Sequence, residues 1–118
     1  GKRTAGYGRF ECRIADIPSN LEKMLEADNC ENYMTISMCM PSDDELSSVL
    51  DGAVYKLTKR GGFVQSSTYS DIQLKKRDFY MFASGAVFKK KFDGDVFDVA
   101  ILKAHPIYKY GKPILLGL

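Results

Sequence analysis

Apolar and polar residues alternate in two early stretches of the chain. In residues 9–18, "RFECRIADIP", the side chains of Phe10, Cys12 and Ile14 fall on one side, and charged residues fall on the other. In residues 31–40, "ENYMTISMCM", methionine and isoleucine alternate with uncharged polar residues. Successive side chains of a strand point to opposite faces. The pattern therefore predicts a strand in each stretch, the first with one face in water.

A helical spacing follows in "PSDDELSSVLDGAVYKLTKRGG". Its apolar residues recur every three or four positions, which is typical of a helix with one buried side. Ser42 and Glu45 have the spacing of a capping box, and Gly61 provides a left-handed stop. The sequence thus predicts a long helix over 43–60. A shorter apolar repeat predicts one or two helical turns over 20–27.

The second half of the chain has strand character. A polar strand is predicted over 62–74 because of its Ser and Thr content. The stretch 77–105, "RDFYMFASGAVFKKKFDGDVFDVAILKAH", contains two long runs joined by Asp93-Gly94, and the first run is apolar on both faces. A two-residue turn there predicts a hairpin in which Lys89 faces Asp98, an opposite-charge pair.

This order of elements predicts the fold class. A strand, a short helix, a strand, a long helix and then several strands, the last over 113–118, indicate an α+β domain. We expect an antiparallel β-sheet of about six strands with both helices packed on it. The single domain is predicted to cover 9–118. It follows a flexible N-terminal arm over 1–8, which contains three glycines and no periodicity.

Composition and charge narrow the class of function. The chain has 118 residues, of which 45% are hydrophobic and 27% charged, as in ordinary globular domains. No apolar stretch is long enough for a transmembrane segment. The 17 basic and 15 acidic residues leave a net charge of only +2, which gives no global attraction to phosphate backbones. We therefore expect no nucleic acid among the partners.

The cysteines do not suggest a metal site. Cys12, Cys30 and Cys39 form no C-x-x-C pair, so they predict neither zinc nor a redox motif. The first and third are interpreted as small buried hydrophobes, and a disulfide from Cys30 is the alternative. The sequence begins at Gly1 without Met, so the compartment stays open between cell envelope or secreted and cytoplasmic. No cofactor is expected.

The order and spacing of these segments resemble the Mog1/PsbP-like group, which includes bacterial lipoproteins and adaptors. The resembling features are "ADIPS" (15–19), the helix-forming stretch "PSDDELSSVLDGAVYKLTKRGG", "FVQSSTYSDIQLKKRDFYMFASGAVF" and the turn "FDGD" (92–95), across roughly 9–104. The resemblance implies a sandwich with helices on the faces of a sheet. It also implies a role in binding proteins or assemblies, without catalytic residues.

Two classes of function are weighed. The first is a non-enzymatic protein-binding module, such as an adaptor, immunity or envelope-associated protein, which binds a protein partner or self-associates. Its docking surface would use the apolar end of the two-sided run with an aromatic rim, comprising Phe79, Met81, Leu102, Tyr108 and Tyr110.

The alternative is a small toxin-type nuclease or hydrolase. His105, the only histidine, would act there with Arg77, Tyr80 or Lys103. No G-x-S-x-G elbow and no phosphate-binding loop accompany it. The absence of such a motif favours the binding module.

Overall fold

The structure is a computed structural model that describes residues 8, 10–64, 68–72, 74–102 and 104–118. Within these residues it has two short helices and nine short strands. The helices are α1 (Ser19–Glu26) and α2 (Asp43–Leu50). The strands are β1 (Tyr33–Thr35), β2 (Leu57–Arg60), β3 (Phe63–Val64), β4 (Leu74–Lys75), β5 (Phe79–Phe82), β6 (Val87–Phe88), β7 (Val96–Asp98), β8 (Tyr108–Tyr110) and β9 (Leu115–Gly117). Neither helix is long and apolar enough to cross a membrane.

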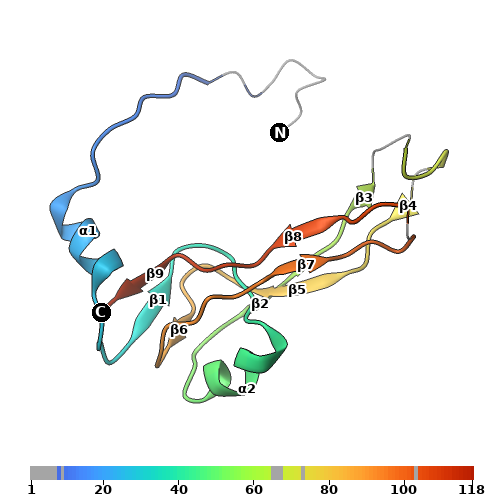
Figure 1. The fold of residues 1–118 in the computed structure, drawn as a ribbon. Helices are drawn as coiled ribbons and strands as arrows, with labels where there is room; N and C mark the ends of the chain where they lie inside the picture. Colours follow the sequence, from blue (N-terminus) through green and yellow to red (C-terminus); the bar gives the residue numbers. More distant parts are fainter. Residues whose placement is uncertain (1–7, 9, 65–67, 73, 103) are drawn as a thin grey trace.

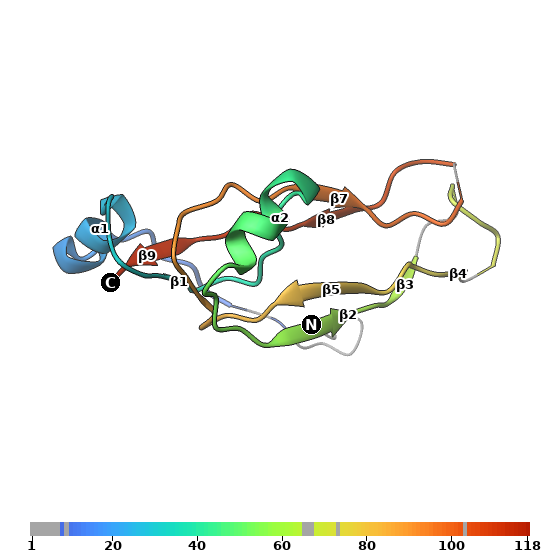
Figure 2. The ribbon, with the colours of Figure 1, turned by 90° about the horizontal axis from the view of Figure 1, so that it is seen from below.

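The strands form four small antiparallel sheets. β1 lies at the centre of a three-stranded sheet, between β6 and β9, and the other strands pair as β2–β5, β3–β4 and β7–β8. The ribbons β2–β5 and β7–β8 run alongside each other away from the three-stranded sheet (Figures 1 and 2). They touch through the rings of Phe79 and Phe97, whose centroids lie 4.7 Å apart. The molecule is therefore an elongated layer rather than one closed sheet.

The hydrophobic core lies where α2 covers the strands around β6. Its buried residues are Cys39, Val49, Phe82, Ala86, Phe88 and Phe92. The ring of Phe88 lies 5.3 Å from that of Phe82 and 5.0 Å from that of Phe92. The apolar run before Asp93 contributes Ala86, Phe88 and Phe92 to this core.

Glu45 joins the start of α2 to the turn at Asp93 and Gly94. Its carboxylate accepts hydrogen bonds from the backbone N–H and hydroxyl of Ser42, both at 2.9 Å. It also accepts the N–H groups of Asp93 at 2.8 Å and Gly94 at 3.2 Å. The predicted capping box is thus confirmed. Its glutamate also binds a turn that lies almost fifty residues further along the chain.

The predicted helix 43–60 is wrong beyond Leu50. Asp51 ends α2, and Gly52, with φ of +67°, takes the left-handed conformation that we had assigned to Gly61. The following residues turn into strand, because Val54 bridges to Val87 and Leu57–Arg60 pairs with β5. Long-range pairing overrides the local helical spacing there.

The predicted sheet of about six strands is also wrong. No strand forms across 10–18, and the segments around Asp93-Gly94 do not pair with each other, because β6 pairs with β1 and β7 with β8. The stretch 62–74 is divided into β3 and β4, which pair with each other. The short helix is present as α1, and the last strand as β9. The arm predicted over 1–8 lies outside the described residues except for Gly8 and stays a prediction.

Candidate interaction surfaces

Two exposed tyrosines share one face of the ribbon β7–β8. In the register of this pair Val96 lies opposite Tyr110 and Asp98 opposite Tyr108, so these side chains point to the same side. Each tyrosine is 66% exposed. The residue between them, Lys109, points to the other side. Two aromatic rings are thereby available on one surface.

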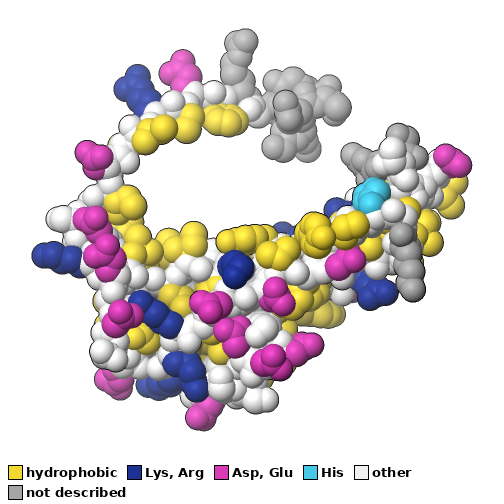
Figure 3. Space-filling model, viewed as in Figure 1, with side chains coloured by type: hydrophobic (Ala, Val, Ile, Leu, Met, Phe, Trp, Pro, Cys, Tyr) yellow, Lys and Arg dark blue, Asp and Glu magenta, His cyan; other side chains and the backbone are white. Residues whose placement is uncertain are grey.

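The apolar surface continues from β8 toward β9. Ile114 follows β8 along the chain, and its carbonyl accepts the N–H of Ile36 at 3.0 Å. Both isoleucines are about half exposed. Figure 3 shows a row of apolar side chains along β9 and β8. We refer to Tyr108, Tyr110, Ile114 and Ile36 as the apolar strip.

The other predicted docking residues do not join this strip. Met81 is 1% exposed and lies in the core side of β5, so it offers no accessible surface. Phe79 is half-buried against Phe97, and Leu102 is exposed at the far tip of the ribbon. The structure brings only Tyr108 and Tyr110 together. A partner-binding role for the five residues stays a prediction.

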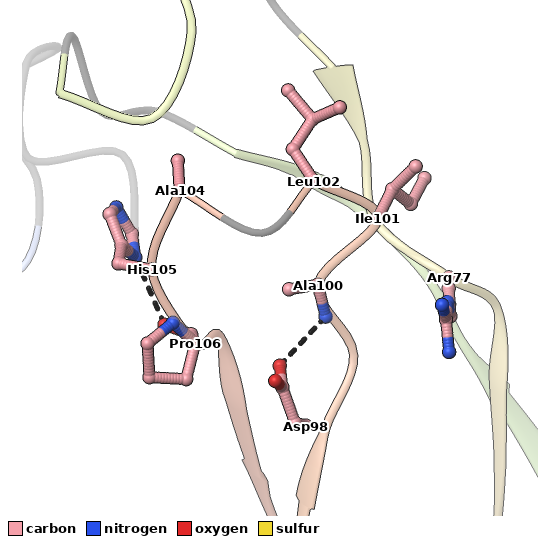
Figure 4. Close-up of a pocket in the computed structure, with 8 residues that line it drawn as sticks. All are labelled: Arg77, Asp98, Ala100, Ile101, Leu102, Ala104, His105 and Pro106. Atoms are coloured by element: carbon pink, nitrogen blue, oxygen red, sulfur yellow. Dashed lines mark hydrogen bonds between the residues drawn. The ribbon is translucent and has the colours of Figure 1, made fainter.

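A shallow pocket of about 540 Å³ lies at this tip. Its lining residues are Arg77, Asp98, Ala100, Ile101, Leu102, Ala104, His105 and Pro106. Arg77 and His105 lie on opposite sides of it, with Asp98 and Ala100 between them (Figure 4). His105 and Arg77 thus line the same pocket, but their side chains do not point toward each other.

Tyr69 holds the pocket loop in place. The ring is buried, and its hydroxyl accepts the N–H of Ile101 at 2.9 Å and of Leu102 at 2.6 Å. The same hydroxyl donates to the carbonyl of Leu102 at 3.2 Å, and the ring lies 5.0 Å from that of His105. The sequence analysis missed Tyr69, because its partners lie more than thirty residues away in a stretch without local pattern.

Asp98 holds together the two ends of the loop that lines the pocket. Its Oδ1 accepts the backbone N–H groups of Ile107 and Ala100, each at 2.9 Å. These two donors hold the pKa of Asp98 below its ordinary value, and the positive charge of Arg77 acts in the same direction. The carboxylate is therefore a structural acceptor for the loop.

The arrangement does not assemble the predicted catalytic group. His105 Nδ1 lies 3.0 Å from the carbonyl oxygen of Pro106, not beside a nucleophile. Tyr80 is on β5 beside Lys59, away from the pocket, and Lys103 lies outside the described residues. Among the described residues no cluster of three His, Cys, Asp or Glu side chains could hold a metal ion.

Several lysines form ion pairs with acidic side chains. Lys59 and Lys75 lie 2.8 and 3.2 Å from Asp78, and Lys91 lies 2.7 Å from Asp28. All of these pairs are largely exposed, so each contributes little to stability. The three cysteines are free thiols, with Cys12 exposed, Cys30 half-buried and Cys39 buried. The predicted alternative of a disulfide from Cys30 is absent from this structure.

Comparison with known proteins gives a consistent result. The family model for the CRISPR Csm4 C-terminal domain matches residues 28–118. Proteins described as CRISPR system Cms protein Csm4 are 44% identical over 118 residues in Mycobacterium tuberculosis and 36% identical over 119 residues in Streptococcus thermophilus. Both matches take in the whole of this chain. The chain spans only 38% and 40% of the length of these relatives.

The fold agrees with a solved member of this group. A chain in the crystal structure of the Csm3–Csm4 subcomplex of the type III-A CRISPR-Cas interference complex superimposes with a TM-score of 0.62. The match is 28% identical and covers 90% of this chain and 31% of that chain. The Mog1/PsbP-like resemblance is therefore wrong, and with it the expectation of a lipoprotein, secreted or envelope-associated protein.

The exclusion of nucleic acid partners is also wrong. CRISPR effectors work with a guide RNA held by protein contacts to its backbone. A net charge of +2 describes the whole chain, whereas contacts to a nucleic acid backbone are made by a few local groups. The solved structure is that of a Csm3–Csm4 subcomplex, and a protein partner for this chain stays a prediction.

The family is shown by the extent of these matches. The family model covers residues 28–118, which is most of the chain. The structural match to a chain of the Csm3–Csm4 subcomplex covers 90% of this chain. The chain belongs to the CRISPR Csm4 C-terminal domain family.

Proposed function

We propose that this chain is the C-terminal part of a type III CRISPR effector subunit and acts there as a non-catalytic binding module. It holds a neighbouring protein subunit, within an assembly that carries guide RNA, and it works in the cytoplasm. The observation that carries the proposal is the family match over 28–118, together with the structural match to a subunit of the Csm3–Csm4 subcomplex.

The described surface supports binding rather than catalysis. His105 has no nucleophile beside it, and Asp98 is occupied by backbone N–H groups. The apolar strip, by contrast, exposes aromatic side chains that need no rearrangement to make contact. Tyrosine is enriched at protein interfaces, and its ring also stacks on bases. Within this surface Tyr108 and Tyr110 are the proposed contacts.

The test uses the full-length protein produced together with its Csm3-like neighbour and guide RNA. A variant with Tyr108→Ala and Tyr110→Ala should lose at least about tenfold in affinity for the assembly, because truncating central interface aromatics costs about 2 kcal/mol or more. Recovery of the tagged assembly and titration of the purified subunit measure the loss.

Tyr80→Ala is the matched control. Tyr80 is also an exposed tyrosine on a strand, but it lies on β5 outside the apolar strip. The control should assemble normally. Unchanged assembly of the double variant would show that the apolar strip is not the interface, and the melting temperature of the free subunit reports whether either change disturbs folding.

A further inference from the structure

Residues 10–17 expose large apolar side chains to water. Phe10 is 81% exposed, Ile14 is fully exposed and Ile17 is more than half exposed. No helix or strand of the described residues includes this segment, and no hydrogen bond joins it to another described residue. Exposed apolar residues in a row indicate a surface that is covered in the working molecule.

The pattern of the segment is that of a strand with one buried face. Phe10, Cys12 and Ile14 alternate with Glu11 and Arg13, so an extended backbone places the three apolar side chains together. The segment leaves α1 and arches over the rest of the molecule, and apolar side chains gather on its inner side (Figures 1 and 3). A strand of this kind requires a sheet edge for its backbone and a core for its apolar face.

The dimensions of the chain agree with a missing neighbour. The Cα radius of gyration is 17.4 Å. A compact domain of this length would have about 13 Å. The segment joins none of the sheets in the described part of the chain.

The comparisons indicate where that sheet belongs. The relatives from Mycobacterium tuberculosis align with all of this chain, residues 10–17 included, whereas the C-terminal domain model matches only residues 28–118. The segment is thus shared with whole Csm4 proteins but lies ahead of their C-terminal domain. These relatives have more than half of their length outside the aligned region.

We propose that residues 10–17 form a strand of the domain that precedes the C-terminal domain in the full-length protein. The strand adds to an edge of that domain's sheet and turns Phe10, Cys12 and Ile14 into its core. The helix α1 then joins the two domains, because it packs against β9 of the C-terminal domain. This inference rests on the proposed place of the chain in the C-terminal part of a longer subunit, but not on the binding of a neighbouring subunit or guide RNA.

Thiol labelling of the full-length protein, alone in solution, tests the proposal. Cys12 is exposed in the present structure and lies on the apolar side of the segment, so its reaction with a maleimide reports burial of that side. We expect the native full-length protein to label at Cys12 at least about 100-fold more slowly than the same protein in denaturant, as for groups that react only after local opening. Mass spectrometry of the peptide containing Cys12 gives the rate. Labelling at the denatured rate would overturn the proposal.

Two further conditions distinguish the preceding domain from other molecules that could cover residues 10–17. Protection that appears only as the protein concentration rises and a dimer forms would assign the segment to a second copy. Protection that appears only after the neighbouring subunit or guide RNA is added would assign it to a partner. Either result overturns the proposal, whereas protection that is independent of concentration and partner supports it.

A matched pair of variants tests whether only the apolar side of residues 10–17 is buried. Ile14→Asp places a charge on the apolar side and should speed labelling of Cys12 at least about tenfold, or prevent folding of the preceding domain. Arg13→Asp introduces the same residue one position away on the wet side and should leave the rate unchanged. Equal effects of the two changes would overturn the strand assignment.

Hydrogen exchange on the unmodified full-length protein gives a reading that needs no variant. A strand paired at one edge protects alternate amides. We expect slow exchange at every second residue of 10–17, and uniformly fast exchange would contradict the proposal.

Discussion

Residues 10–17 and the stretch around β1 have the same alternating pattern but opposite surroundings. β1 lies between β6 and β9, and Tyr33 and Thr35 on it are buried. The earlier segment forms no strand in the described part of the chain, and its apolar side chains are exposed. Both segments alternate, but β1 buries Tyr33 and Thr35 rather than the more apolar Met34 side. Strand pairing and the covering layer, not the alternation itself, therefore decide what is buried.

The difference shows what alternation can predict. Alternating residues make a segment able to form a half-buried strand, but the partner strand and the covering layer come from elsewhere in the chain. For β1 these partners are more than fifty residues away, at Val87 and Leu116. For residues 10–17 the proposed partner belongs to a preceding domain. The predictions below test this contrast, starting with the largest expected effect.

The same substitution should have a large effect in one region of the 118-residue chain and almost none in the other. Phe88 on β6 is fully buried and packs between two other aromatic rings. Phe88→Ala should lower the free energy of unfolding by about 3–5 kcal/mol, the cost of emptying an aromatic site in a core. Phe10→Ala should change it by less than about 0.5 kcal/mol, because the Phe10 side chain is 81% exposed. Denaturant unfolding measures both.

The contrast is then sharpened in the full-length protein. There Phe10→Ala should also become destabilising, because the proposed docking buries the ring. If Phe10→Ala did not change the stability of the full-length protein, the Phe10 ring would not be buried there, and the proposed docking would be wrong.

Local signals in the sequence predicted the beginnings of elements better than their ends. Ser42 and Glu45 correctly placed the start of α2, and the polar Asp51-Gly52 pair, not Gly61, ends it. The helical spacing continued through Val54 and Leu57, but these residues join strands whose partners lie far along the chain. Local spacing carries no information about such partners, so the long helix and the six-stranded sheet could not be distinguished from the observed fold.

The candidate surface was predictable only in part. Tyr108 and Tyr110 were identified from their spacing, and the register with β7 places them on one exposed face. Ile36 and Ile114 joined them only through a contact between residues that are distant in the chain. Met81 looked equally available, because nothing local showed that β5 would turn it into the core. The CRISPR family came from the comparison with relatives, since net charge averages over all surfaces.

Glu45 offers a second test, since it connects α2 with the turn after the core strands. Glu45→Gln keeps the shape but replaces one carboxylate oxygen with a donor that faces backbone N–H groups. We expect a loss of about 1–2 kcal/mol in the free energy of unfolding, the usual cost of unpaired polar groups. Glu22→Gln on α1 is the control, because Glu22 is exposed. Equal effects of the two changes would show that the connection to Asp93 and Gly94 is not stabilising.

The stability of the native chain should depend on pH through the same carboxylate. Burial acts to raise the pKa of Glu45, but the N–H groups of Asp93, Ser42 and Gly94 and the hydroxyl of Ser42 outweigh it, so the pKa is below its ordinary value of 4.5. A lowered folded pKa means that the contribution is present above about pH 4.5 and is lost as the pH falls through the folded pKa. Glu45→Gln should therefore flatten the decline in stability below this pH. Unfolding curves recorded between neutral and acidic pH test this, and an unchanged decline would place its cause in other carboxyls.

The smallest expected effect lies at the ribbon tip, where Asp98 bonds two amides far from the core. Asp98→Ala removes the acceptor for the N–H groups of Ala100 and Ile107, so those amides should exchange about three to ten times faster. The melting temperature should not change, because the tip opens without unfolding β1 and its neighbours. The amide of Phe82, bonded to the carbonyl of Cys39 at 2.8 Å, is the internal control. If exchange at Phe82 accelerated as well, the tip and the hydrophobic core would open together, and the tip would not be an independent unit.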